Sequence, residues 1–340
     1  MKTSLLVVAP GRGSYSRNTL GYIQNRSSER LKDINLLRKQ KNRMTPVEID
    51  AQTRFRGAFH LAGEEASLLT AACSISDFDD INWERYELSG VCGNSMGHYT
   101  ALILSGVLSS PQGVELIDQM GDYQKNNIIG GQLVYPLCDE EWNLVPERKE
   151  IIDRLLQDIP DLHLSIQLGY QYILAGSDVA LKKAKEMLPS FQFSNREFPI
   201  ALPMHSAFHT PLLQQTAQRA QADLAHIDWG QPHTYLIDGH GTIWSPWSSN
   251  PNDIAHYTLG AQVTETYNFT QMIQHAISLL APQKIALLGP GSNLGGAIIQ
   301  SIIDIGWFGI KSKQDFLKRQ ADDPILLSMG REEQRKILCQ

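Results

Sequence analysis

The chain has 340 residues, of which 42% are hydrophobic and 19% are charged, a composition typical of a globular protein with a large core. Its formal net charge of −6 argues against nucleic acid as the main partner, because phosphate binding requires a clustered positive field. The apolar run at residues 4–9 is too short to span a membrane and leads directly into Pro10-Gly11-Arg12. We therefore expect a cytoplasmic protein that binds neither nucleic acid nor a membrane.

The four cysteines predict no metal site. They form no CxxC pair, and the first three lie in apolar surroundings, where cysteine packs as a small hydrophobic residue: Cys73, Cys92, Cys138 and Cys339. We expect no disulfide framework, no metal and no bound cofactor.

The predicted elements begin with a strand at about residues 4–9 and a helix-rich region from about 46 to 74. Between these lies a basic stretch, formed by Arg30, Lys32, Arg38, Lys39, Lys41 and Arg43. This stretch is either the solvated face of a helix or a surface for an acidic partner protein. An apolar run at 88–92 then predicts a strand, and a helical pattern follows at 99–107.

The pattern changes between about 129 and 203. Strands are predicted at 132–137, 162–166, 170–175 and 198–202, and helices at 147–156 and 178–188, the second capped by Ser177. This β-α-β-β-α-β order is the signature of a ferredoxin-like module. A helix from about 211 to 225, a buried strand at 285–288 and a charged helical segment from about 313 complete the chain.

The segment Gly93-Asn94-Ser95-Met96-Gly97 lies where the strand at 88–92 meets the next helix. A sharp strand-to-helix turn lifts a serine Oγ out of the sheet edge and leaves N–H groups free to hold a developing oxyanion. Ser95 is therefore a candidate nucleophile. Because the five-residue pattern is common, a structural turn whose glycines only permit tight packing remains the alternative.

A serine hydroxyl needs a base within hydrogen-bond reach, and this base is usually histidine. Among the ten histidines, His209 is the candidate, because it lies between a strand end and a helix that begins at Pro211. The alternative is a histidine that only caps that helix. His205 has no derivable role, and we expect it to be structural.

On these residues the chain resembles the malonyl-CoA:acyl carrier protein transacylases and the acyltransferase domains of polyketide synthases. Four separated motifs carry the resemblance in the right order: Pro10-Gly11-Arg12-Gly13-Ser14, Gly93-Asn94-Ser95-Met96-Gly97, Ala207-Phe208-His209-Thr210-Pro211-Leu212 and Gly289-Pro290-Gly291. The resemblance implies an α/β fold with a large α/β-hydrolase-like catalytic domain, residues 1–128 and 204–340. The ferredoxin-like βαββαβ domain, residues 129–203, is inserted into it.

The resemblance also implies a two-step exchange without a metal. Ser95, deprotonated by His209, attacks an acyl-CoA thioester, and the phosphopantetheine thiol of an acyl carrier protein then accepts the acyl group. A main-chain carbonyl at Gln262 orients the imidazole. The N–H groups of Met96 and Arg12 hold the oxyanion, with Arg12 replacing the glutamine of the family's Gly-Gln-Gly loop.

Four residues concern the substrate, and three of them, Met120, Arg12 and Asn94, depart from the family pattern. Met120 takes the place of the arginine that pairs with the malonyl carboxylate in the family, so malonyl is not the expected acyl group unless another cation substitutes. Arg12 is the one obvious substitute, but it also suits a CoA or pantetheine phosphate, or an acidic surface residue. Phe208 either fills space near the acyl α-carbon or belongs to the core. Asn94 replaces a family histidine beside the nucleophile and is expected to contact substrate.

Three other functions remain open. A thioester hydrolase uses the same Ser95 and His209, but water replaces the carrier thiol and clears stalled acyl carriers. An unrelated α/β-hydrolase esterase requires an acidic residue and a histidine after the serine. A non-catalytic subunit that binds the carrier needs no nucleophile.

Overall fold

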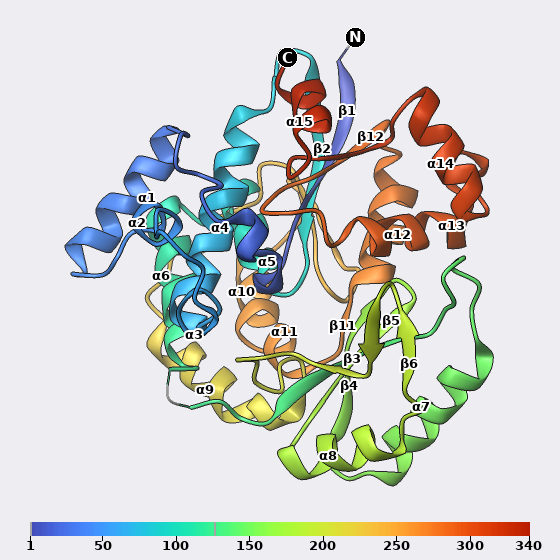
Figure 1. The fold of residues 1–340 in the computed structure, drawn as a ribbon. Coiled ribbons are helices and arrows are strands. Elements are labelled where there is room, and N and C mark those ends of the chain that lie inside the picture. The colour runs from blue at the N-terminus through green and yellow to red at the C-terminus, as the bar shows by residue number, and fades with distance from the viewer. Residues whose placement is uncertain (1, 126) are drawn as a thin grey trace.

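The computed structural model describes residues 2–125 and 127–340 and contains two main sheets (Figure 1). The larger sheet has six strands in the order β10-β9-β2-β1-β12-β13. The neighbouring pairs β9·β2, β2·β1, β1·β12 and β12·β13 are parallel. The edge strand β10 pairs with β9 in the antiparallel direction. Their bounds are β1 Thr3–Ala9, β2 Tyr86–Gly93, β9 Tyr235–Ile237, β10 Ile243–Trp244, β12 Lys284–Leu287 and β13 Leu326–Ser328.

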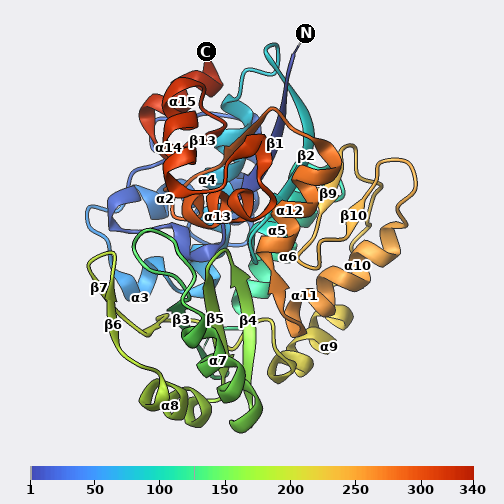
Figure 2. The same cartoon turned by 90° about the vertical axis from the view of Figure 1, so that its right-hand side faces the viewer.

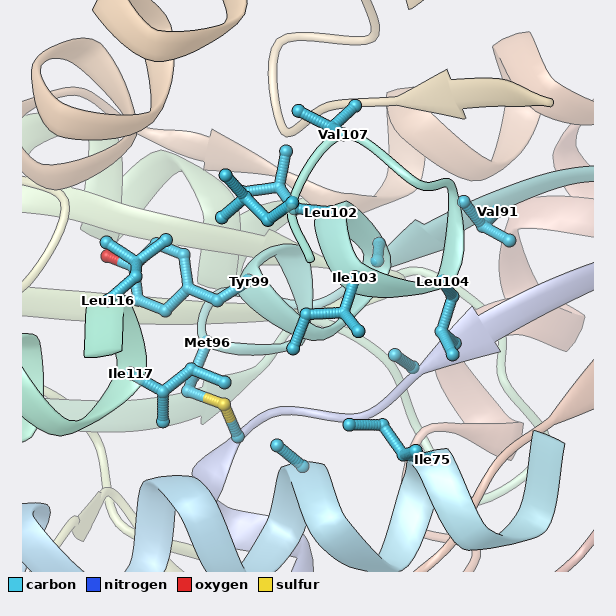
Figure 3. Packing of buried hydrophobic residues seen from close by; sticks show 14 of the residues in the cluster. Ile75, Val91, Met96, Tyr99, Leu102, Ile103, Leu104, Val107, Leu116 and Ile117 are labelled. Atoms are coloured by element: carbon cyan, nitrogen blue, oxygen red, sulfur yellow. The ribbon is translucent and has the colours of Figure 1, made fainter. Parts of the chain in front are cut away.

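The apolar run of β1 explains its central position. Side chains alternate between the two faces of a strand, and both faces of this sheet are covered by helices. Leu5, Val7 and Ala9 pack into the core under the helices α4 (Gly63–Asp80), α5 (Gly97–Leu104) and α6 (Ser110–Asp122). Leu6 and Val8 pack under α12 (Phe269–Leu280) and α13 (Gly295–Ile305). Figure 3 shows part of the core on the α4, α5 and α6 side of the sheet, where side chains of these helices pack against the strands.

Helices cover both faces of the larger sheet, as the second view shows (Figure 2). Those before or beside the nucleophile turn are α1 Glu29–Gln40, α2 Pro46–Asp50, α3 Gly57–His60, α4 Gly63–Asp80, α5 Gly97–Leu104 and α6 Ser110–Asp122. Those after the smaller sheet are α9 Gln214–Asp223, α10 Pro251–Leu259, α11 Ala261–Thr264, α12 Phe269–Leu280, α13 Gly295–Ile305, α14 Lys313–Asp322 and α15 Glu332–Cys339.

The smaller sheet contains the predicted β-α-β-β-α-β order. Its elements are β3 Gly131–Pro136, α7 Pro146–Asp158, β4 Leu162–Leu168, β5 Gln171–Gly176, α8 Asp178–Met187 and β8 Ile200–Ala201. The spatial order is β11-β4-β5-β3-β8, and the pairs β4·β5, β5·β3 and β3·β8 are antiparallel. The Ser177 side chain caps α8 as predicted, accepting a hydrogen bond from the Ala180 N–H.

Two details of this sheet differ from the prediction. The strand expected at 198–202 is shortened to β8, because Pro199 has no N–H to donate, and Phe198 instead ends a hairpin of β6 Phe191–Phe193 and β7 Arg196–Phe198. In addition, β11 Tyr267–Asn268 extends the sheet from outside the 129–203 range by pairing with β4.

Both interpretations of the basic stretch are wrong for its central residue. Arg38 is fully buried and forms ion pairs with Glu65 of α4 and with Asp118 of α6, the latter at 3.0 Å. Arg43 pairs with Asp122 at 2.9 Å. The charges of α1 therefore join this helix to its neighbours, a long-range pairing that spacing along one helix does not reveal.

The prediction for the C-terminal segment was incomplete, because β13 lies between α14 and α15 and adds a parallel strand to the larger sheet. Cys73, Cys92 and Cys138 are buried free thiols, as expected from their surroundings. Within residues 2–125 and 127–340, no helix combines the length and apolarity needed to cross a bilayer. The same ranges contain no cluster of three or more His, Cys, Asp or Glu side chains suited to a metal.

Candidate active site

The turn between β2 and α5 is tight because two glycines allow close backbone approach. A Cβ at Gly93 would lie 2.1 Å from the Gly97 carbonyl oxygen, and a Cβ at Gly97 would lie 2.4 Å from the Ala9 carbonyl oxygen. Ser95, at the bend, has a φ of 54° in the left-handed region, which is rare for a residue other than glycine. The turn therefore holds Ser95 in a strained position at the C-terminal end of β2.

Ser95 and His209 are in direct contact. Ser95 Oγ lies 2.7 Å from His209 Nε2, and His209 Nδ1 lies 2.6 Å from the main-chain oxygen of Gln262. A carbonyl oxygen only accepts, so Nδ1 carries the proton and donates to Gln262. In this tautomer Nε2 is free to accept the serine proton. No carboxylate takes the place of the carbonyl at this imidazole among the described residues.

The side chain of Gln262 connects the histidine support to the nucleophile turn. Its Nε2 donates to the Ser95 carbonyl oxygen at 3.2 Å, and its Oε1 accepts from the Tyr99 hydroxyl at 3.0 Å. The His209 N–H donates to the carbonyl oxygen of Val263 at 2.9 Å. Two main-chain oxygens of α11, those of Gln262 and Val263, therefore hold His209, and the Gln262 side chain holds the main chain of Ser95.

Burial lowers the pKa of His209 to about 4, and the hydrogen bond to Gln262 opposes this shift only in part. The side chain is 2% exposed, so water stabilises the imidazolium poorly. At neutral pH the imidazole is uncharged and is therefore ready to accept a proton.

The serine and histidine face a cavity of about 260 Å³. All the predicted site residues line it: Arg12, Asn94, Ser95, Met96, Met120, Phe208, His209 and Gln262. The N–H groups of Arg12 and Met96 donate no hydrogen bond elsewhere in the described parts of the chain. Both are therefore available for an oxyanion near Ser95.

Phe208 lines the cavity and also packs against the core under α4, α5 and α6, and its place near the acyl α-carbon stays a prediction. The Ser165 hydroxyl of β4 donates to the Phe208 carbonyl oxygen at 2.8 Å, so the smaller sheet positions the histidine loop. His205 also lines the cavity, and its Nδ1 lies 2.8 Å from the Pro203 carbonyl oxygen. Burial, and to a smaller extent the Arg12 charge, lower the pKa of His205 to about 3.

The Arg12 side chain is directed at the end of α6 and at the loop that leads to His209. Nη1 donates to the Gln124 side chain, and Nη2 donates to the Met204 carbonyl oxygen at 2.7 Å. The guanidinium carbon lies 5.7 Å from the centre of the Phe208 ring. Burial lowers the pKa of Arg12 to about 10, so the group remains cationic at neutral pH.

Sequence reasoning missed several residues that support this site. Tyr99 lies two residues after the nucleophile motif, and nothing in the sequence indicated that its hydroxyl reaches Gln262. The Tyr267 hydroxyl donates to the Gly93 carbonyl oxygen, and its ring centre lies 5.2 Å from that of His209. Gln124 and Ser67 line the cavity without belonging to any motif.

No protein-family model matches the chain. A segment of 147 residues, 43% of the chain, is 25% identical to the polyketide biosynthesis protein ThaF of Burkholderia thailandensis. The match spans only 12% of the length of that protein.

Solved structures match over nearly the whole chain. The malonyl-CoA:ACP transacylase of Synechocystis has a TM-score of 0.75 at 16% identity, covering 99% of this chain and 100% of the other. The acyl-carrier-protein S-malonyltransferase of Burkholderia pseudomallei has a TM-score of 0.76 at 16% identity, covering 99% of each chain.

A third structure holds a type II polyketide synthase acyl carrier protein in complex with its malonyl-transacylase. It has a TM-score of 0.73 at 16% identity and covers 99% of each chain. Over almost all of its length the chain therefore has the fold of the malonyl-CoA:acyl carrier protein transacylases, which confirms the resemblance indicated by the sequence motifs.

Proposed function

We propose that the chain is an acyltransferase that moves an acyl group from acyl-CoA to the phosphopantetheine thiol of an acyl carrier protein, in polyketide or fatty-acid synthesis. The observation that carries this proposal is the hydrogen-bonded series from Ser95 Oγ through the His209 imidazole to the Gln262 carbonyl, within one cavity. Such a series is the arrangement of an activated serine nucleophile.

In the first step, the Ser95 hydroxyl proton moves to His209 Nε2 while Oγ bonds to the thioester carbon. The resulting oxyanion accepts hydrogen bonds from the N–H groups of Arg12 and Met96. The carbon–sulfur bond then breaks, and the leaving thiolate takes the proton from Nε2 and departs as CoA. Throughout, the Gln262 carbonyl stabilises the imidazolium through its Nδ1–H.

In the second step, the carrier thiol gives its proton to Nε2 and its sulfur attacks the acyl carbon. The bond to Ser95 Oγ breaks, and the proton returns to this oxygen. No tightly bound cofactor takes part in either step, and acyl-CoA is a substrate. The fold shared with a transacylase seen in complex with its carrier protein supports an acyl carrier protein as the partner.

We also propose a division into an α/β-hydrolase-like domain, residues 1–128 and 204–340, and an inserted ferredoxin-like domain, residues 129–203. The antiparallel order β4-β5-β3-β8 supports the ferredoxin-like description of the insert. The pairing of β4 with β11, and the Ser165 contact to the histidine loop, join the insert to the rest. The substrate cavity lies where these parts meet.

The test is incubation with a radiolabelled acyl-CoA and a holo acyl carrier protein. A transferase labels the carrier, and this labelling requires the phosphopantetheine thiol. Release of free acid with no labelled carrier would instead identify a thioester hydrolase on the same fold. A second assay distinguishes the two activities with a labelled acyl carrier protein as the only substrate. A hydrolase releases free acid from this carrier without CoA, whereas a transferase moves the labelled acyl group to CoA only when CoA is added.

A further inference from the structure

Arg12 is a buried cation that no carboxylate neutralises. Its side chain is 7% exposed, and no Asp or Glu of the described chain lies within ion-pair distance of it. Its hydrogen-bond partners are the neutral Gln124 side chain and a main-chain oxygen. Glu64 acts on it only at longer range. An unpaired buried charge is costly, so such a group implies an anionic partner that arrives with a ligand.

Packing places the guanidinium beside the helix that bears Met120. A Cβ at Gly63, the first residue of α4, would lie 2.9 Å from Arg12 Nη1, and a Cβ at Gly121 would lie 2.6 Å from the Gly63 carbonyl oxygen. Met120 precedes Gly121 on α6. Arg12 therefore extends from the loop after β1 to the same helical turns as Met120.

A second polar group at this end of the cavity has no partner. Ser67 lies one turn beyond Gly63 on α4, is 6% exposed and lines the cavity. Its hydroxyl makes no hydrogen bond with any other residue that the structure describes. By contrast, no Asp or Glu is among the described residues that line the cavity. The lining at this end therefore supplies donors for an anion and no competing negative charge.

We propose that the acyl group carries a carboxylate, and that Arg12, with Ser67 as a second donor, is the residue that selects it. This inference rests on the proposed acyltransferase function and names its substrate class as short acyl groups that end in a carboxylate. A guanidinium binds a planar carboxylate with two parallel hydrogen bonds, and burial strengthens both. In this chain Met120 contributes an apolar wall, and the positive charge comes from the N-terminal loop.

The other anion available is a phosphate of CoA or of the carrier arm. That phosphate lies at the far end of the pantetheine arm from the thioester, whereas Arg12 lines the same cavity as Ser95 and Phe208. We therefore assign the acyl carboxylate, and the experiment uses thioesters of pantetheine, which carry no phosphate.

The experiment measures the rate at which malonyl-pantetheine and acetyl-pantetheine acylate Ser95, by intact mass. The wild-type protein should react faster with the malonyl thioester. Arg12→Gln should lower the malonyl-to-acetyl rate ratio by about 10- to 100-fold, because it removes a charge-assisted interaction. Ser67→Ala, which changes no charge, should lower the same ratio by about three- to tenfold and gives a second readout if Arg12→Gln does not fold.

Arg148→Gln is the matched control. Arg148 also donates to a main-chain oxygen, that of Cys138 at 2.7 Å, and its guanidinium lies over the ring of Phe191, but it is outside the cavity. Its removal should leave the rate ratio unchanged.

Four results would overturn the inference. Equal malonyl and acetyl rates in the wild type, or an unchanged ratio in both Arg12→Gln and Ser67→Ala, would show that the acyl carboxylate is not selected here. If Arg12→Gln slows both CoA thioesters equally, leaves both pantetheine thioesters unaffected and does not change the malonyl-to-acetyl ratio, Arg12 would be assigned to a phosphate. If no thioester of any kind acylates Ser95, the proposed function itself fails and the inference fails with it.

Discussion

Acylation of Ser95 should persist in mild acid. The base must be uncharged to accept the serine proton, and burial lowers the pKa of His209 to about 4 from an ordinary value of 6.5. At about pH 5.5, a group with the lowered pKa is about 97% neutral, whereas one with the ordinary pKa is about 9% neutral. The two cases therefore differ by about tenfold in acylation rate at this pH.

The assay is a rapid-quench measurement of the acyl-enzyme by intact mass, between about pH 5 and 8, with substrate well below saturation so that the free protein is observed. Circular dichroism at each pH confirms that the protein is folded. We expect an acylation rate that changes less than about twofold between pH 7.5 and 5.5. A tenfold fall with a midpoint near the ordinary histidine value would show that water reaches His209 and that burial does not set its pKa.

Four further predictions follow from the same contacts. Ser95→Ala should lower turnover by about three or more decades and remove the acyl-enzyme mass; residual turnover within tenfold of wild type would point to another nucleophile. Gln262→Ala keeps the main-chain oxygen that orients His209, so kcat/KM should fall only about tenfold, and a loss as large as that of Ser95→Ala would contradict this division. Burial lowers the pKa of His98 to about 3, so His98 and His209 both favour unfolding as the pH falls below 6.5, by about 2 kcal/mol each at pH 5 in urea titrations; equal stability at pH 5 and 7 would refute their burial. Arg38→Ala leaves two carboxylates without their buried partner and should cost about 3–5 kcal/mol of unfolding free energy, whereas a loss below about 1 kcal/mol would mean that the ion pairs are solvated.

The nucleophile turn was predictable because its determinants are local. Gly93 and Gly97 lie within two residues of Ser95, and the close contacts that require them arise from the turn itself and from the neighbouring β1. The βαββαβ order was likewise visible in the alternation of apolar runs. The shortening of its last strand followed from a single proline whose effect on pairing depends on the neighbouring strand.

The rest of the site depends on contacts between distant residues. His209 lies 114 positions from Ser95 and 53 from Gln262, so spacing along the chain did not pair them. His209 was a candidate because of its place before the helix that begins at Pro211, and the role of Gln262 came from the family resemblance. Tyr99 and Gln124 gave no signal, because their roles depend on which helix packs beside which loop. The same holds for the burial of Arg38, since its two acidic partners come from other helices. The strand β13 is only three residues long, too short to show a period.

The central claim is that Ser95 becomes acylated because His209 removes its proton. The most direct test is intact-mass analysis, with peptide mapping, of the wild-type protein and of His209→Ala after brief exposure to malonyl-CoA and acetyl-CoA. The wild type should gain one acyl group on the peptide that contains Ser95, and His209→Ala should gain it at least about a thousandfold more slowly. An acyl group on another residue, or equal acylation rates in the two proteins, would contradict the account.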